Sequence, residues 1–325
     1  MIRVIVMAVI SCVVAAVLGH FLLPVLRALK AGQSVRSIGP TWHNNKAGTP
    51  LMMGLMFIGS TLVCLLLNLP NTQEYSAIYV FVLAFCFGAI GFLDDYCKVR
   101  KKRDMGLTAI QKFLLQGAVS AVFLYVLYME GILTCDLYIP FFNVRFYIQP
   151  SVYLLFSMFI IVGTVNAVNL TDGIDGLSAS VTVPVMVFFA ATALAVDREE
   201  LAVLPAAMIG GLLAFLGLNW HPAKAFMGDT GSLFMGGVVC GLAYALDMPL
   251  VLIFAGFVYL METLSVILQV SYFKLTHGKR LFKMSPIHHH FEMSGWKEEK
   301  IVLTFAGVSA VMCVVAWLSI SGIVG

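Results

Sequence analysis

Long apolar segments alternate with short polar ones along the whole chain. Ten of the apolar segments have about the 20 residues that a helix needs to cross a bilayer. They cover residues 4–26, 51–69, 77–93, 110–129, 151–168, 177–196, 201–218, 231–248, 250–273 and 301–322. Their hydrophobic runs are continuous rather than alternating, which favours helices over a transmembrane β-barrel. The pattern predicts an all-α integral membrane protein of ten transmembrane helices, folded as a single domain over residues 1–325.

The distribution of charge over the loops predicts how the chain crosses the membrane. Hydrophobic residues make up 60% of the chain and charged residues 11%, against roughly 25% in soluble domains, which excludes a soluble globule. The loops after the odd-numbered spans hold 17 of the 20 lysines and arginines, and only Arg3, Arg145 and Arg198 lie on the other side. Because basic loops remain cytoplasmic, we expect both termini outside the cell. The net charge of +3 reflects this orientation and gives no indication of nucleic-acid binding.

Two features of the sequence carry no chemistry in our interpretation. Aromatic and β-branched residues alternate around Asn143 in the outer loop 130–150, which predicts a short hairpin. The seven cysteines include no CxxC pair and lie mostly inside apolar segments, so we interpret them as small packing residues.

The third predicted span ends abruptly in two adjacent carboxylates. Residues 77–93 carry no charge, and Asp94 and Asp95 follow directly, ahead of a basic run over residues 98–103. Two like charges a few Å apart resist joint ionisation, so such a pair at a membrane edge is costly unless a ligand binds it. A divalent cation or a role in proton transfer would explain the pair, and two solvated helix-end charges are the alternative.

Three further carboxylates lie at predicted cytoplasmic span ends. Asp172 and Asp175 belong to the motif NAVNLTDGIDGLS, which has no basic residue, and Asp229 belongs to FMGDTGS ahead of the eighth span. A helix N-cap would explain Asp229 alone, but not five acids on one face of the membrane. Oxygen ligands that converge without cysteine indicate Mg²⁺ rather than Zn²⁺. We therefore predict a magnesium site with Asp229 as a ligand.

The ninth predicted span carries one acid in its interior. If residues 250–273 form a continuous helix, Glu262 lies about 18 Å of helical rise beyond Pro249. A carboxylate at that depth usually faces the bundle interior or a cavity. Gln269 follows two turns nearer the cytoplasm on a similar face.

The last cytoplasmic loop holds three consecutive histidines, His288 to His290, in the segment SPIHHHFEMSGW. Adjacent residues rarely chelate one ion together and no cysteine is nearby, so imidazoles that face a phosphate are favoured over a zinc site. Neighbouring side chains on a helix point about 100° apart, so the three rings do not all reach one substrate. We predict unequal roles for them.

Four motifs of this chain, FLDDYCKVRKK, NAVNLTDGIDGLS, FMGDTGS and PIHHHFE, together resemble those of the polyprenyl-phosphate sugar-1-phosphate transferases. With the loop WHNNKAGTP, the last motif is similar to the phospho-N-acetylmuramoyl-pentapeptide transferase branch of that superfamily. The resemblance implies a Mg²⁺-dependent enzyme of the bacterial inner membrane with its active site on the cytoplasmic side. It implies transfer of phospho-MurNAc-pentapeptide from UDP-MurNAc-pentapeptide to undecaprenyl phosphate, giving lipid I for peptidoglycan synthesis and releasing UMP. A homodimer is left open.

The resemblance also implies roles for particular residues. Asp94 and Asp95 match the acid pair, with Asp94 as the proposed base, Asp229 matches the metal ligand, and His288 is our choice for the active ring. Phe226 matches an aromatic residue that stacks on uracil. We expect substrate contacts from Lys46, Lys98, Lys102, Lys112, Asn166, Asn169, Asp172, Asp175, Asn219, Phe226, Gln269, His289 and His290.

One segment departs from the family pattern. After Gly-Thr-Pro the family usually continues with Thr-Met-Gly-Gly, whereas this chain reads Leu51-Met52-Met53-Gly54. The difference bears on a hydroxyl contact at position 51 and on a close backbone approach at position 53.

Two alternative functions stay open at this stage. The donor could be UDP-N-acetylglucosamine in a related transferase, although the PIHHHFE loop argues against it. The chain could also be an ion-coupled transporter, but transporter sites usually lie near the membrane midplane, whereas five acids here lie at span ends. The sequence also leaves open whether transfer is direct or passes through a covalent enzyme intermediate.

Overall fold

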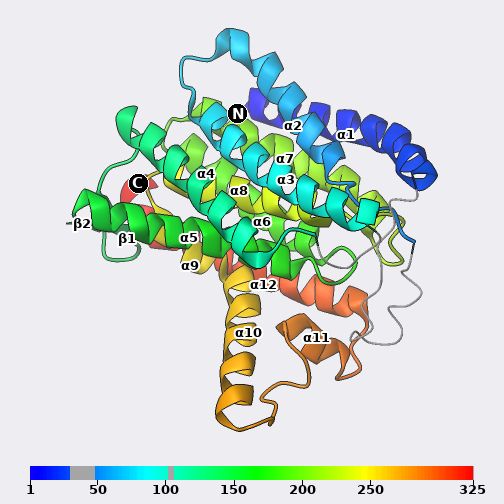
Figure 1. Cartoon of the computed structure of the whole chain (residues 1–325). Coiled ribbons are helices and arrows are strands. Elements are labelled where there is room, and N and C mark those ends of the chain that lie inside the picture. Colours follow the sequence, from blue (N-terminus) through cyan, green and yellow to red (C-terminus); the bar gives the residue numbers. More distant parts are fainter. Residues whose placement is uncertain (30–47, 102–105, 325) are drawn as a thin grey trace.

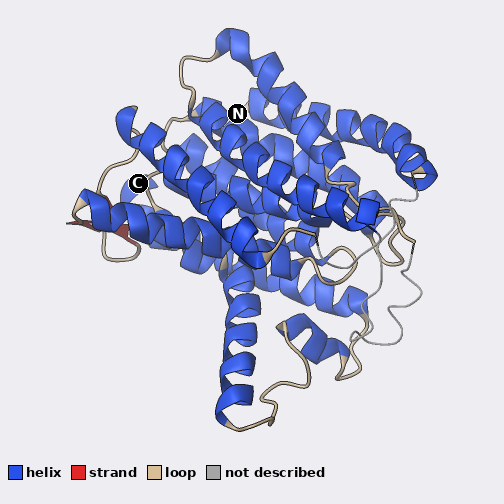
Figure 2. Cartoon of the chain, in the orientation of Figure 1, coloured by secondary structure: helices blue, strands red, loops and turns tan. Residues whose placement is uncertain are grey.

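The computed structural model describes residues 1–29, 48–101 and 106–324, and helices make up most of it (Figures 1 and 2). The helices are α1 (Ile2–Ala28), α2 (Leu55–Asn68), α3 (Ser76–Lys101), α4 (Ala109–Met129), α5 (Pro150–Thr171), α6 (Leu177–Ala195), α7 (Glu199–Asn219), α8 (Gly228–Ala245), α9 (Leu252–Ala255), α10 (Phe257–Leu275), α11 (Ile287–Glu292), α12 (Glu298–Ser319) and α13 (Ser321–Val324), with 3₁₀ turns η2 (Leu69–Asn71) and η3 (Pro249–Val251). The predicted hairpin is confirmed as β1 (Asp136–Ile139) and β2 (Val144–Tyr147), which pair antiparallel.

The fold class is confirmed as an all-α membrane protein, apart from this hairpin. Among the described residues, α1, α3, α4, α5, α6, α7 and α12 are long and apolar enough to cross a membrane. The bent pair of η3–α9 and α10 makes an eighth span if it is counted as one. α2 is apolar but has only 14 residues. The prediction of ten crossings therefore stays a prediction, although every predicted segment is helical.

The expectation of one continuous ninth helix is wrong. The helix breaks at Gly256, and the two parts are bent by 83°. A Cβ at Gly256 would lie 2.6 Å from the backbone oxygen of Leu252, so the bend requires glycine at this position. α10 then projects from the bundle (Figure 1). The depth of Glu262 inferred from continuous helical rise is therefore wrong as well.

The core of the bundle is α8, where every residue other than Asp229 is buried. Its glycines let α3 approach closely, because a Cβ at Gly237 would lie 2.7 Å from the Cα of Ala84. At the other end of the contact, a Cβ at Gly91 of α3 would lie 2.1 Å from the backbone oxygen of Asp229. Small residues at such crossings are typical of membrane helix pairs, which gain from van der Waals packing rather than from a hydrophobic driving force.

We predict that Gly91→Ala destabilises the protein, because the added methyl group overlaps the α8 backbone, which has no flexible end to move aside. Overpacking of this kind costs about 1–3 kcal/mol. Thermal unfolding in detergent would measure the loss. The control is Gly163→Ala in α5, where no atom lies within 4 Å of the added Cβ. Equal unfolding temperatures for the two variants would contradict the close crossing.

Candidate active site

Three carboxylates from two helices meet at one end of the α3–α8 contact. Asp94 and Asp95 lie in the last two turns of α3, and Asp229 lies in the first turn of α8. One oxygen of each lies within 4.8 Å of the others. Asp94 and Asp95 are 0% and 1% exposed. Such a concentration of buried negative charge requires donors or cations close by.

Backbone and hydroxyl donors satisfy part of this requirement. The backbone N–H of Thr230 donates to Asp95 Oδ2 at 2.9 Å, and the Thr230 hydroxyl donates to the same oxygen at 2.8 Å. The N–H comes from the start of α8, where the helix dipole favours negative charge. The backbone N–H of Leu107, just ahead of α4, donates to Asp94 Oδ1 at 2.7 Å.

Two lysines supply positive charge to the same place. Lys98, one turn after Asp94, places its Nζ 2.6 Å from Asp94 Oδ2 and 3.0 Å from Asp229 Oδ2. Lys112, in the first turn of α4, places its Nζ 2.8 Å from Asp229 Oδ2 and 3.1 Å from Asp94 Oδ2. Lys112 thus points to the acids rather than along the membrane surface. Three carboxyl groups thus face two ammonium groups.

A cavity of about 460 Å³ opens on these groups. Its lining consists of Asp94, Lys98, Gly106, Leu107, Ala109, Lys112, Phe113, Gln116, Asn166, Asn169 and Asp229. Asn169 Nδ2 donates to Asp229 Oδ1 at 2.9 Å and to the Ser232 hydroxyl at 2.7 Å, which orients the acid. The structure therefore brings six of the predicted site residues into one cavity, and Asp95 lies directly behind it.

Asp172 lies beyond the end of α5, next to this cluster. Burial, reinforced by the negative charge of Asp229 and of two further acids, raises the pKa of Asp172 to about 8. The neighbourhood therefore holds more carboxyl groups than it keeps ionised at neutral pH, a condition that favours the binding of a cation.

Asp175 and Asn219 hold the loop between α7 and α8. Asp175 Oδ2 lies 2.9 Å from His221 Nδ1 and accepts the backbone N–H of Ala223 at 3.0 Å. The Asn219 side chain accepts the N–H of Gly176 and donates to the carbonyl of Ala225, both at 2.9 Å. Both residues thus act on the loop that carries Phe226, and their direct contact with substrate stays a prediction.

Phe226 is held by the segment that departs from the family pattern. Its backbone N–H donates to the Pro50 carbonyl at 2.8 Å, and the N–H of Met53 donates to the Phe226 carbonyl at 2.9 Å. The Met53 side chain is fully buried. The close backbone approach lies one residue later, because a Cβ at Gly54 would lie 2.4 Å from the Cα of Gly231.

His288 is fully buried between α10 and the loop that follows α5. Its Nδ1 lies 3.0 Å from Glu262 Oε2, and both side chains are 0% exposed. A Cβ at Gly173 would lie 2.2 Å from His288 Nε2, so the ring packs directly on the backbone beside Asp172. His288 does not belong to the lining of the acid cavity.

The other two histidines have different surroundings. His289 Nδ1 lies 2.9 Å from Glu292 Oε2, and His290 Nδ1 accepts the backbone N–H of Lys283 at 3.2 Å. The three environments are unequal, as the helical spacing predicts. Which ring meets substrate stays a prediction.

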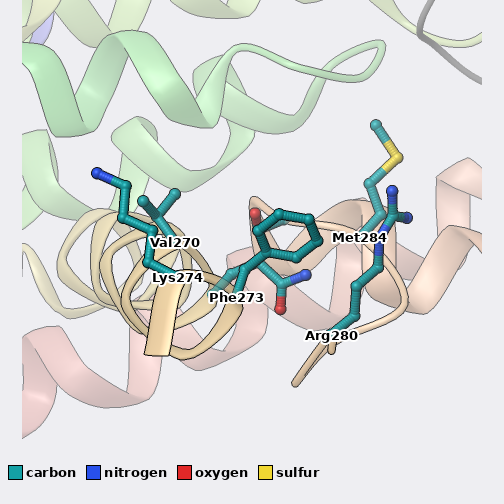
Figure 3. A pocket seen from close by; sticks show the side chains of 7 residues that line it. Val270, Phe273, Lys274, Arg280 and Met284 are labelled. Atoms are coloured by element: carbon teal, nitrogen blue, oxygen red, sulfur yellow. The ribbon is translucent and has the colours of Figure 1, made fainter. Parts of the chain in front are cut away.

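Gln269 fastens the loop after α10. Its Oε1 accepts the backbone N–H groups of Leu281 and Phe282 at 3.0 and 2.8 Å. It also lines a second cavity, of about 300 Å³, together with Val270, Phe273, Lys274, Arg280, Met284 and Ser285 (Figure 3). A substrate contact of Gln269 stays a prediction.

Two predicted residues, Lys46 and Lys102, lie outside the described residues. Conversely, sequence reasoning missed Thr230, Ser232 and Gln116. Gln116 carried a usable signal, because it is a polar residue inside an apolar span and lies one turn after Lys112. Thr230 and Ser232 carried none beyond their place beside Asp229.

Comparison with known proteins gives consistent matches. Residues 77–247 match the family described as Glycosyl transferase family 4. A protein of Clostridium acetobutylicum named phospho-N-acetylmuramoyl-pentapeptide-transferase is 45% identical over 302 residues, which are 93% of this chain and 94% of that protein. This chain is also similar to two further proteins of that name. The protein of Caldanaerobacter subterraneus is 46% identical to this chain over 314 residues (96% of each chain), and that of Heliobacterium modesticaldum is 46% identical over 303 residues (93% of each chain).

We predict that Thr230→Val lowers the free energy of unfolding by about 1–3 kcal/mol, because it leaves buried Asp95 with one donor fewer at an unchanged side-chain shape. Thermal unfolding would measure it. Thr61→Val is the matched control, because the Thr61 hydroxyl is also buried but donates to the weak acceptor sulfur of Met208, at 3.4 Å, rather than to a carboxylate. If both variants unfold like the parent, the Thr230 hydroxyl does not stabilise the acid.

Proposed function

We propose that this chain, which belongs to the phospho-N-acetylmuramoyl-pentapeptide transferases of glycosyl transferase family 4, moves phospho-MurNAc-pentapeptide from UDP-MurNAc-pentapeptide to undecaprenyl phosphate. The products are lipid I and UMP. The observation that carries the proposal is the convergence of Asp94, Asp95 and Asp229 with Lys98 and Lys112 in one cavity. UDP-N-acetylglucosamine is not favoured as donor, because relatives similar over more than nine tenths of the chain bear the other name.

The reaction joins two anions, so the enzyme must offset their repulsion. An oxygen of the lipid phosphate attacks the phosphorus that carries the sugar, the bond to the UMP phosphate breaks, and UMP leaves with that electron pair. Lys98 and Lys112 line the cavity and supply positive charge to the substrate phosphates. Positioning and electrostatic stabilisation account for most of the catalysis in phosphoryl transfer.

The acid cluster fits Mg²⁺. Three carboxylates each offer a hard oxygen within 4.8 Å of the others, and Lys98 Nζ already lies within 3.8 Å of all three, so the cluster attracts a cation. Asp229 would hold the ion, with Asp94 and Asp95 beside it. Bound there, Mg²⁺ would neutralise charge on the diphosphate.

Asp94 is our candidate for the base or nucleophile. A phosphate monoester has a second pKa of about 6, so most lipid phosphate carries no proton to remove at neutral pH. A base role for Asp94 therefore applies to the singly protonated fraction of the acceptor, whereas the dianion would attack directly, with Asp94 orienting the two lysines. A covalent intermediate on Asp94 is the alternative.

We assign the donor nucleotide to the loops around the acid cluster. Phe226 would stack on the uracil, and Asp172, Asp175, Asn166 and Asn169 would line this side. Lys46, Lys102 and Asn219 are further expected contacts. His288, which packs on the Gly173 backbone, would contact the substrate together with His289 and His290. Gln269 would hold the loop after α10 in place.

We propose that the protein crosses the bacterial inner membrane ten times, with both termini outside and the cavity at the cytoplasmic face. The uneven distribution of lysine and arginine supports this orientation. A soluble nucleotide and a lipid phosphate meet only at such an edge. A homodimer stays an expectation from the sequence resemblance.

The function is tested by incubating the purified protein with UDP-MurNAc-pentapeptide, undecaprenyl phosphate and Mg²⁺ and measuring the release of UMP.

In this assay, Asp94→Asn should lower turnover by about 10²–10⁴-fold or more, the usual contribution of a general base. Asp229→Asn should lower turnover and raise the Mg²⁺ concentration needed for half-maximal rate. Asp136→Asn in the hairpin is the control. A parent protein that releases no UMP from this donor would refute the proposal.

Orientation is tested with single cysteines in a variant whose seven native cysteines are replaced. Phe142→Cys, in the hairpin turn, should react with a membrane-impermeant maleimide on intact cells, because this side chain is 75% exposed and its loop is expected outside. Lys279→Cys, after α10, should react only after lysis. The reverse labelling pattern would overturn the topology.

A further inference from the structure

Gln116 is a buried amide in the acid cavity with a donor left over. It lies in α4, is 1% exposed, and lines the same cavity as Lys112 and Asp94. Its Nε2 has no hydrogen-bond partner among the described residues. A buried N–H group without a partner is costly, so an amide kept in this state indicates a ligand that completes it.

The orientation of this amide follows from its neighbours. The backbone carbonyl of Val162 only accepts hydrogen bonds, so the atom of Asn166 that lies 2.8 Å from it must be the donor Nδ2. The same Nδ2 lies 2.7 Å from one end of the Gln116 amide, which must therefore be the acceptor Oε1. The remaining end is the NH₂ group. The Asn166–Gln116 pair thus fixes an N–H donor without relying on an arbitrary choice of amide orientation.

The position of Gln116 identifies the part of the cavity that it serves. It follows Lys112 by one helical turn, about 6 Å further along α4 from the end that carries the acid cluster. The exposed side chains Ile110 and Leu114 of this stretch lie on the outer side of α4, away from Gln116. Phe113, which is 63% exposed, also lines the cavity, so the cavity reaches the face of α4 that is turned toward lipid. Gln116 thus lies on the inner side of α4, one turn further from the acid cluster than Lys112, in a cavity whose Phe113 wall is exposed.

The chemistry of the side chains that line the cavity indicates which kind of group Gln116 binds. The ammonium groups of Lys98 and Lys112 already contact carboxylates, whereas the Gln116 NH₂ has no hydrogen-bond partner in the part of the chain that the structure describes. A neutral donor binds a phosphate oxygen without adding charge to the cluster. We infer that Gln116 Nε2 binds a non-bridging oxygen of the polyprenyl phosphate and positions it for attack, an assignment that rests on the proposed function.

The polyprenyl phosphate is favoured over the donor diphosphate because Gln116 lies further along the membrane-spanning helix than the lysines do, in a cavity that reaches the exposed Phe113. A polyprenyl phosphate keeps its chain in the bilayer and enters with its phosphate leading, so its phosphate reaches the lipid end of the cavity first. The same donor chemistry would also suit the diphosphate of the nucleotide substrate. The two sources are separated by measuring KM for each substrate.

The test uses Gln116→Glu in the full-length protein. Glutamate has the same length and keeps an acceptor for Asn166, but it replaces the NH₂ donor by a negative oxygen. We expect KM for the polyprenyl phosphate to rise at least tenfold, with KM for UDP-MurNAc-pentapeptide changed less than twofold. Binding of the nucleotide, followed by calorimetry, should stay at the parent value.

Two further variants separate this role from a structural one. Gln116→Asn retains an amide on a shorter side chain and should recover part of the affinity for the acceptor that the glutamate loses. Ser120→Ala, one turn further along α4, removes a buried hydroxyl outside the cavity lining and should leave both KM values unchanged. Unfolding temperatures of all variants should agree within the error of the measurement.

The possible results are distinct. An acceptor KM within twofold of the parent for Gln116→Glu overturns the inference, and so does a rise confined to the nucleotide KM, which would assign the amide to the donor diphosphate. A rise in both that follows a lower unfolding temperature also overturns it. Failure of the parent protein to release UMP would instead refute the proposed function itself.

Discussion

The close crossing of α3 and α8 is the contact on which the acid cluster depends. The carbonyl of Asp229 packs on the Cα of Gly91, and Asp94 and Asp95 follow within about one helical turn, so the acids of both helices meet. Between helices in lipid, packing supplies most of the attraction, and it falls off steeply with distance. Glycine at this point therefore does two things at once. It lets the helices approach, and it sets the 4.8 Å spread of the carboxylate oxygens.

Bringing these acids together creates an electrostatic problem that the surrounding elements solve. The start of α8 supplies Thr230, the segment before α4 supplies the Leu107 N–H, and α4 supplies Lys112. Donors from three separate elements thus converge only when α3, α4 and α8 are all in place. Carboxyl groups still outnumber ammonium groups at the assembled site, so it attracts a cation more readily than a bare phosphate. A phosphate bound there consequently gains from a cation bound beside it.

Much of the fold was readable from the sequence, because continuous apolar runs admit few alternatives to helices in lipid. The convergence of the acids was predictable for a similar reason: five carboxylates at span ends on one side must lie near one plane. The sequence did not reveal which groups the polar side chains at the span ends would form hydrogen bonds with. Asp175 and Asn219 were recognisable as polar residues at span ends, but their bonds to the 220–227 loop depend on how two distant loops meet. The break at Gly256 was missed because one glycine in an apolar run is usually tolerated without a bend.

The bend at Gly256 determines where the histidine motif lies. By turning α10 through 83°, it brings Glu262 against His288 instead of leaving the carboxylate in the bundle. The pair is fully buried, and the ring rests on Gly173, a position where any side chain would displace it. Because Gly173 directly follows Asp172, the His288 ring contacts the backbone of the acid-rich loop itself. Glu262 therefore orients the His288 ring from one side, and the ring packs from the other side against the Gly173 backbone beside the acid cluster.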